Sequence, residues 1–186
     1  MFKVLIGVVV VAVAALVVFM VIDPSIGITT TEPNSVIIVD DDSLSIAEGY
    51  FSATIEGEVT KPGSYVLEDG STMGDLIECA GGITPYGDDY AYYDDALLTS
   101  GMTYYIPSKY DTSDVCQLVE IQKVNINTAS LEQLLEVKAF TNSVASSLIS
   151  YRVENGEFKT LESILDVYGI GNATYRKLRN NIILHQ

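Results

Sequence analysis

The chain has 186 residues and a formal net charge of −15, with 25 acidic and 10 basic side chains. This length allows one medium-sized domain or two small ones with a tail, and it leaves no room for a catalytic domain beside them. Counted along the sequence, residues 1–122 sum to −16 and residues 123–186 to +1. The asymmetry predicts modules with different partners, of which only the C-terminal one is suited to a polyanion.

The first element is a run of 19 uncharged, apolar residues from Val4 to Ile22. As a helix it would be roughly 28 Å long, close to the hydrocarbon thickness of about 30 Å. Lys3 precedes the run and Asp23 follows it, so the positive-inside rule places the N-terminus in the cytoplasm and the rest outside the cell. A cleaved signal peptide is the competing interpretation, but its apolar core is shorter and ends at small residues. We predict an uncleaved transmembrane anchor, residues 1–22.

Residues 23–49 are typical of a linker, with a short strand expected at residues 36–39. The next 61 residues, 50–110, carry the pattern of a small domain. Alternation predicts strands at residues 53–59, 64–67 and 103–106, and Ser71 or Thr72 can cap a helix that runs through Cys79. A second linker, residues 111–122, follows.

Four short motifs in this domain occur in a recognisable order. They are Gly57-Glu58-Val59, Lys61-Pro62-Gly63, Ala80-Gly81-Gly82, and Ser100-Gly101-Met102 followed by Tyr104-Tyr105-Ile106-Pro107. Together they resemble the SLBB (soluble-ligand-binding β-grasp) family. The resemblance implies a β-grasp fold with a ligand-binding or an assembly role, and it nominates no residue as a ligand contact.

Residues 86–110 hold seven of the twelve tyrosines, together with four aspartates. Tyrosine-rich surfaces suit sugar or protein contacts, because the ring packs while the hydroxyl bonds. The alternative is a loop of half-buried rings with a solvated acidic face, and the acids argue against nucleic acid here. Cys79 and Cys116 are either a disulfide or two free thiols.

Residues 123–186 predict four short helices around a small core. We expect helix starts at Asn127/Thr128, at residues 141–143, at Thr160 and after Gly171, with Ile182 on the last helix. The apolar positions at helical spacing account for the core. The only histidine, His185, is expected to be an exposed tail residue.

The turn before the last helix reads Gly169-Ile170-Gly171. Glycines permit unusual backbone angles and leave no Cβ in the way of a ligand, while the isoleucine can anchor the turn in the core. Backbone amides and the positive end of the next helix then suit a phosphate, with Arg179 adding screened attraction. The candidate DNA contacts of this hairpin are Gly169, Ile170, Gly171, Asn172, Thr174, Arg176 and Lys177.

The glycine turn lies within a longer ordered set of segments. They are Val124-Asn125-Ile126-Asn127-Thr128-Ala129, Tyr151-Arg152, Asn155-Gly156-Glu157-Phe158 and Gly169-Ile170-Gly171. This set resembles the twin helix-hairpin-helix domain of the ComEA family, the membrane-anchored DNA receptors of bacterial competence, and the domain order also matches Gram-positive members. The resemblance implies capture of double-stranded DNA outside the cell and its transfer toward an uptake channel.

The chain departs from that family in its first hairpin. Where the family has Pro-Gly-Ile-Gly, this sequence has Lys138-Ala139-Phe140-Thr141. Phe140 can still anchor the turn, but Ala139 and Thr141 add Cβ atoms where the phosphate would approach. Side chains can replace the lost backbone contacts, and the candidates are Lys138, Thr141, Asn142 and Ser143. Weaker, one-sided DNA binding and a purely structural module are both open.

We therefore predict an α+β chain with a transmembrane helix, a small SLBB-like β-grasp domain and an all-α helix-hairpin-helix domain. Its predicted function is that of a membrane-tethered extracellular receptor that binds double-stranded DNA without sequence specificity, for uptake in natural transformation. The alternative is a surface assembly, glycan-binding or protein-binding module that acts through the SLBB domain. Candidate partners are double-stranded DNA, the membrane through residues 4–22, a DNA-uptake channel protein and a second copy of the chain. We expect no catalytic residue, cofactor or metal site.

Overall fold

The computed structural model describes residues 39–40, 43–44, 46–111 and 117–186. The predicted anchor, most of the first linker and Cys116 lie outside these residues. None of the helices in the described part of the chain has both the length and the apolar character that a bilayer-spanning segment requires. Two short strands, β1 (Val39–Asp40) and β2 (Ser43–Leu44), pair antiparallel ahead of the first module.

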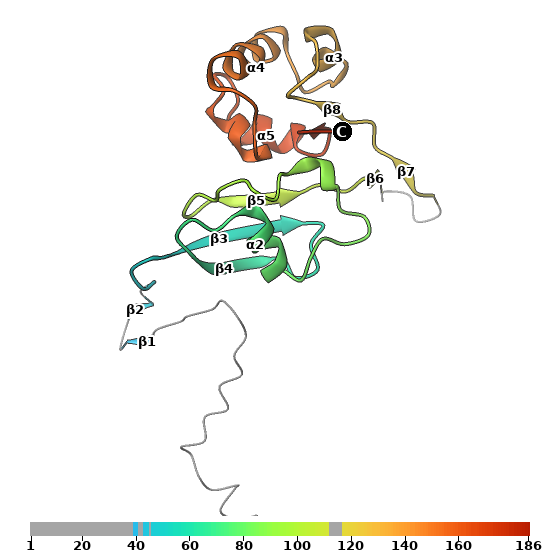
Figure 1. Ribbon diagram of the computed structural model, residues 1–186. Coiled ribbons are helices and arrows are strands. Elements are labelled where there is room, and N and C mark those ends of the chain that lie inside the picture. The colour runs from blue at the N-terminus through green and yellow to red at the C-terminus, as the bar shows by residue number, and fades with distance from the viewer. Residues whose placement is uncertain (1–38, 41–42, 45, 112–116) are drawn as a thin grey trace, which may run out of the picture. The chain divides into compact units, whose positions relative to one another are not determined.

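The first module, which we call the sheet module (residues 50–110), is built on three strands in the order β4-β3-β5. The central strand β3 (Tyr50–Gly57) pairs antiparallel with β4 (Gly63–Glu68) and parallel with β5 (Thr103–Ile106), and helix α2 (Met73–Cys79) packs on the sheet (Figure 1). Alternate residues of a strand point to opposite faces, so Phe51, Ala53 and Ile55 all enter the core.

Two local features fix this module. Thr72 and Asp75 form a capping box at the start of α2, with the Thr72 amide donating to Asp75 Oδ2 over 2.7 Å. Gly57 ends β3 with φ +89°, and a Cβ there would collide with the carbonyl oxygen of Ile106. Glycine is therefore required where the two strands part. A 3-10 turn, η1 (Asp89–Ala91), and a short pair of strands, β6 (Tyr110–Asp111) with β7 (Val119–Glu120), complete the connection to the second module.

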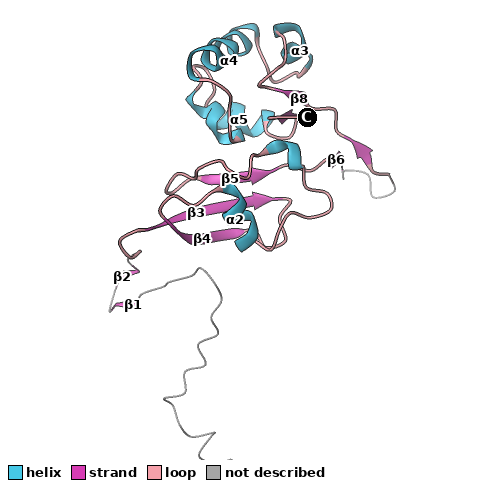
Figure 2. Ribbon diagram, viewed as in Figure 1, coloured by secondary structure: helices cyan, strands magenta, loops and turns pink. Residues whose placement is uncertain are grey.

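The second module, which we call the helical module (residues 123–186), contains α3 (Leu131–Glu136), α4 (Asn142–Asn155), the 3-10 helix η2 (Leu161–Asp166) and α5 (Asn172–Leu178) (Figure 2). Its ends, β8 (Val124–Asn125) and β9 (Ile182–Ile183), pair as parallel strands. The mixed α+β class is thus confirmed, but the prediction of an all-α second domain is wrong.

Two details of the helical module differ from the predicted helices. Helix α3 starts after Ser130, which forms the capping box, and not after Asn127/Thr128. Helix α5 ends at Leu178, so Ile182 lies in β9 and not on the helix. The reason is burial: Ile182, Ile183 and Leu184 are successive and all buried, which one face of a helix cannot provide.

Asn127 has a different task from the capping role that we predicted. Its Nδ2 donates to the carbonyls of Phe158, over 3.0 Å, and Leu184, over 2.9 Å, while its Oδ1 accepts from the Phe158 amide over 2.8 Å. The Arg152 guanidinium similarly donates to the carbonyls of Ile126 and Ala129, each over 2.6 Å. These polar residues bind the module's first and last segments to its middle.

The two modules share buried contacts. Ala91 of the sheet module is 1% exposed and packs into the core of the helical module. The Leu184 amide donates to the Tyr90 carbonyl over 2.8 Å, and Lys123 forms a buried ion pair with Asp88 at 2.6 Å. His185 is half-buried, with Nε2 at 2.8 Å from the Tyr92 carbonyl oxygen.

His185 is therefore not the exposed tail residue that we expected. Its ring lies 4.6 Å from that of Tyr93 and 5.6 Å from that of Tyr90. The Lys159 ammonium lies 4.5 Å from the centre of the Tyr93 ring. Part of the tyrosine-rich stretch thus packs against the C-terminal segment. Tyr92 and Tyr93 are half-buried, as one of our two interpretations of this stretch proposed.

A second set of contacts surrounds Glu162, which is only 3% exposed. One of its oxygens, Oε1, accepts from the amide of Tyr105 in β5 over 2.9 Å and from the Tyr175 hydroxyl over 2.5 Å. Arg179 covers the Tyr105 ring at 3.7 Å. Burial raises the pKa of the Glu162 carboxyl to about 7, although both donors and Arg179 pull it in the opposite direction.

We predict that Asn127→Ala destabilises the folded chain by about 2–4 kcal/mol, because buried donors and acceptors lose their partners. Chemical denaturation followed by circular dichroism measures this loss. The matched control is Asn155→Ala, which removes one exposed hydrogen bond from the side-chain amide to the Tyr151 carbonyl. It should lower the free energy of unfolding by no more than about 0.5 kcal/mol. Equal losses of stability in the two variants would contradict the role assigned to Asn127 in joining the segments of the module.

The raised pKa of Glu162 predicts a pH dependence of stability. Between the ordinary pKa of 4.5 and about 7, the folded state binds a proton that the unfolded state has released, so stability falls as pH rises through this window. In Glu162→Gln this contribution to the decline should vanish. Denaturation of both proteins from pH 4 to pH 8 isolates it, since the other titrating groups are shared. Parallel curves would show that the pKa of Glu162 is not raised in the folded chain.

Candidate nucleic-acid interface

The helical module contains an internal repeat with an offset of 30 residues, in which SLEQLLEV (residues 130–137) corresponds to TLESILDV (residues 160–167). Each copy leads into a turn, the first at residues 137–141 and the second at residues 167–171. In the first turn the Phe140 amide donates to the Val137 carbonyl over 2.9 Å, and in the second the Ile170 amide donates to the Val167 carbonyl over 3.0 Å. The two turns are therefore structural equivalents.

The second turn leaves its backbone open. Gly169 has φ +90°, a conformation that side chains strongly disfavour, and Ile170 is 4% exposed and anchors the turn in the core. Gly171 is the N-cap of α5 and provides no side-chain hydrogen bond to the helix. Nothing lies within 4 Å of the position that a Cβ on Gly171 would take. The amides that begin α5 are accordingly uncapped beside open space.

The first turn is closed by a side chain. Phe140 is 5% exposed and anchors it as Ile170 anchors the second. Thr141 is the N-cap of α4, and its Oγ1 accepts from the Val144 amide over 3.3 Å. A donor that an incoming anion would use is thus already bonded. Thr141, one of the two residues expected to add a Cβ at this turn, thus also occupies one of the amide donors with its hydroxyl oxygen.

The two turns lie side by side. A Cβ placed on Gly169 would come within 3.5 Å of Val144 Cγ2, in the first turn of α4. An open groove of about 470 Å³ also joins Ser143 and Ser147 of α4 to Tyr168 of the second turn. The predicted contacts of both hairpins are therefore brought together on neighbouring surfaces, with Lys138, Thr141, Asn142 and Ser143 all exposed.

The polar residues of α5 and its C-cap differ in exposure and in their partners. Asn172 and Arg176 are exposed and line a hollow of about 330 Å³ shared with Thr103 and Tyr105 of the sheet module. Lys177 is also exposed, whereas Thr174 is half-buried. Arg179 is bound within the chain, with Nη1 at 3.8 Å from Glu56 Oε2 and its guanidinium over Tyr105. Of the three cations predicted near the turn, Arg176 and Lys177 remain accessible.

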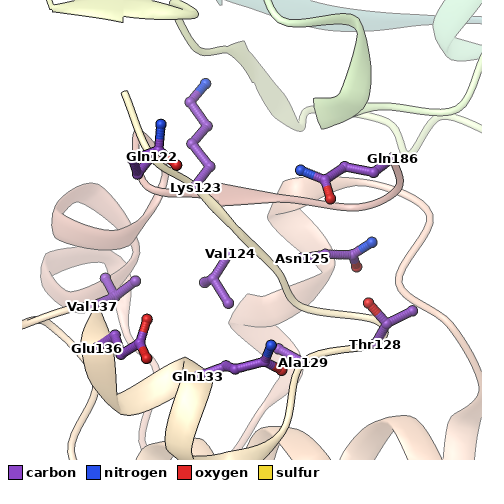
Figure 3. A pocket seen from close by; sticks show the side chains of 10 residues that line it. All are labelled: Gln122, Lys123, Val124, Asn125, Thr128, Ala129, Gln133, Glu136, Val137 and Gln186. Atoms are coloured by element: carbon purple, nitrogen blue, oxygen red, sulfur yellow. The ribbon is translucent and has the colours of Figure 1, made fainter. Parts of the chain in front are cut away.

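Another hollow, of about 430 Å³, lies between β8 and α3 (Figure 3). Its polar lining consists mainly of amides, from Gln122, Asn125, Gln133 and Gln186. Glu136 adds a carboxylate, while the Lys123 ammonium pairs with Asp88. Because it offers no free cation and contains none of the predicted contacts, this hollow is unsuited to a polyanion.

Sequence reasoning missed two residues of this region, Tyr168 and Glu162. The internal repeat was the available signal, because Tyr168 aligns with Lys138 and Glu162 with Glu132. Glu132 is exposed while Glu162 is buried, so equivalent letters have different roles. Within the described residues, no cluster of three or more His, Cys, Asp or Glu side chains is arranged to hold a metal ion.

Comparisons with known proteins match both modules. The helix-hairpin-helix motif family matches residues 119–183, and the SLBB domain family matches residues 52–91. ComE operon protein 1 of Bacillus subtilis is 36% identical over 137 residues, which cover 69% of this chain and 67% of that protein.

Other relatives share a smaller part. Endonuclease/exonuclease/phosphatase family domain-containing protein 1 of Mus musculus is 37% identical over 60 residues, 32% of this chain and 10% of that protein. An uncharacterized protein of Haemophilus influenzae is 35% identical over 72 residues, 38% of this chain and 64% of that protein. The mouse similarity covers too little of that protein to carry its activity to this chain.

The two glycines of the second turn should respond differently to substitution. Gly171→Thr should stabilise the chain by on the order of 0.5 kcal/mol, because threonine can cap α5 as Thr141 caps α4 and the space is open. Gly169→Ala should destabilise it by about 1–3 kcal/mol, because φ +90° strains any side chain. Denaturation midpoints measure both. If Gly171→Thr were the more destabilising of the two, the assigned geometry of this turn would be wrong.

Proposed function

Because this chain belongs to the ComEA-like family of competence DNA receptors, we propose that it binds double-stranded DNA outside the cell without sequence specificity, for uptake in natural transformation. The observation that carries the proposal is the uncapped, unobstructed turn at Gly169–Gly171, beside the equivalent turn of the first hairpin. We propose that this turn receives a phosphate of the DNA backbone.

The physical basis is the orientation of backbone donors. The first amides of a helix have no intrahelical partner, and the helix end carries a partial positive charge. A phosphate oxygen can therefore accept from these amides wherever no side chain intervenes. Contacts of this kind fix the protein on the duplex but do not distinguish bases.

The charges of the helical module support only modest affinity. Several of its cations already have partners inside the chain: Arg152 on backbone carbonyls, Lys123 on Asp88, Arg179 on Tyr105 and Glu56. Lys138, Arg176 and Lys177 are exposed. Three phosphate contacts predict a slope of roughly −3 for log affinity against log salt concentration.

Modest affinity fits a receptor held at a surface, since one DNA molecule can engage many tethered copies at once. We propose that residues 4–22 provide the tether, with the N-terminus in the cytoplasm and both modules outside the cell. On this proposal the chain binds DNA without cleaving it and passes it to an uptake channel protein. Contact between copies on the same DNA would give self-association a role, which analytical ultracentrifugation with and without DNA would reveal.

The alternative function, in which the SLBB-like module binds glycan or protein through its tyrosines, has less support. The Tyr93 ring lies at a tilt beside that of His185 with the Lys159 ammonium over it, and Arg179 covers the Tyr105 ring. Tyr86 and Tyr90 are the more exposed of these rings, at 43% and 44%. Tyr93 and Tyr105 therefore already contact other side chains of this chain and are less available to a glycan or a protein.

Fluorescence anisotropy of a labelled, random-sequence duplex tests the proposal, with the full chain in non-ionic detergent at several salt concentrations. We expect sequence-independent binding with the slope given above. Gly171→Thr should weaken binding about tenfold although it stabilises the fold, because the added side chain blocks the phosphate. The matched control is Gly63→Thr, where a Cβ also meets open space but on the sheet module.

The contrary outcomes are distinct. No binding at low salt would refute DNA as the ligand of this chain. Binding that Gly171→Thr and Gly63→Thr leave equally unchanged would refute the second turn as the phosphate site. A steep preference for one duplex sequence would refute recognition through the backbone.

A further inference from the structure

Tyr168 is displayed in an unusual way. Its side chain is 86% exposed, the largest value among the exposed large hydrophobic residues in the described part of the chain. Its neighbour Val167 is 2% exposed and Ile170 is 4% exposed. Single exposed apolar residues are common on protein surfaces, so exposure alone assigns no role. The position of the ring gives it significance.

The ring is held out by a rigid support. The turn beneath it is closed by the hydrogen bond from the Ile170 amide to the Val167 carbonyl, at 3.0 Å, and by the left-handed conformation of Gly169. Buried side chains anchor it on both sides. Because the backbone is fixed, presenting this ring to a ligand costs little conformational entropy, which favours tyrosine as a contact residue.

Tyr168 also lies between the two proposed DNA-binding elements. It directly precedes the open turn at Gly169–Gly171, and it shares a groove with Ser143 and Ser147 of the first hairpin's helix. In the repeat its counterpart is Lys138. The two hairpins therefore present an aromatic ring and an ammonium group at the same structural position.

The surroundings of the ring indicate which part of DNA it meets. Asp166 and Glu154 line the same groove, and their carboxylates repel phosphate. Serine hydroxyls and the tyrosine ring are uncharged. Deoxyribose rings are uncharged and occur at every nucleotide, so they are the part of a duplex that suits such a surface beside Gly171.

We propose that Tyr168 is a further DNA contact, whose ring packs against the deoxyribose of the strand held by the second hairpin. This inference rests on the proposed function and deepens it. The contact is non-ionic, so it contributes affinity that salt does not weaken. It is also independent of sequence, because the sugar is the same at each step.

The two hairpins then contribute by different physics. Lys138 acts by charge, so its contribution falls as salt screens it. Tyr168 acts by burial of an aromatic surface, a contribution that is characteristic of energetically dominant interface residues. Their variants should accordingly have different signatures in a salt titration.

Anisotropy with the full chain in non-ionic detergent separates these signatures. Tyr168→Ala should lose about tenfold in affinity at every salt concentration with an unchanged salt slope. Lys138→Ala should flatten the slope by about 1. Tyr86→Ala, which removes an exposed ring from the sheet module, is the matched control and should bind as the parent does.

A spectroscopic arm locates the contact directly, because the chain has no tryptophan. Tyr168→Trp introduces one indole at the tip of the turn. Bound DNA should shift the wavelength of its fluorescence emission and reduce its quenching by acrylamide. Tyr86→Trp is the control and should show neither effect. A Tyr168→Ala variant that binds as tightly as the parent, or an indole that stays fully accessible at saturating DNA, overturns the role of Tyr168 while DNA binding stands. Failure of the parent chain to bind DNA overturns both proposals.

Discussion

The burial of one apolar side chain at each hairpin tip is the constraint on which the helical module depends. Phe140 and Ile170 occupy equivalent positions, and each pulls its turn against the core through the same short hydrogen-bonded loop. Burial of this side chain fixes the turn that precedes the first amides of the next helix. Whether those amides are available is then decided by one residue, threonine in the first copy and glycine in the second. A small change in side chain thus separates a capped turn from an open one.

Several of the basic side chains of this acidic chain bond within the fold and are not free to bind DNA. Arg152 donates to two backbone carbonyls, Lys123 forms an ion pair with Asp88, and the Arg179 guanidinium lies over the Tyr105 ring. The remaining exposed cations are too few for tight binding to a polyanion at physiological salt. Such a chain is suited to multivalent binding, in which many copies each bind the same DNA molecule weakly.

The junction between the modules covers one edge of the sheet. Glu162 accepts from the Tyr105 amide at the free edge of β5, so the helical module covers an edge that would otherwise be open to another strand. Tyr175, which bonds Glu162, belongs to the same helix that starts at the open turn. The proposed phosphate site is therefore connected through one short helix to a buried carboxylate whose protonation changes near neutral pH.

From the residue pattern alone, the order of the two modules, the strands and helix of the sheet module to within a few residues, and the glycine turn could all be predicted. These follow from local alternation, capping residues and glycine, which act over a few positions along the chain. The pairing of β8 with β9, the hydrogen bonds by which Asn127 joins distant segments, and the half-burial of His185 depend on long-range packing and could not be predicted. The tertiary structure also decided which of two similar glutamates is buried, because Glu132 and Glu162 differ in what the fold packs against them, and that is a property of residues far apart in the sequence.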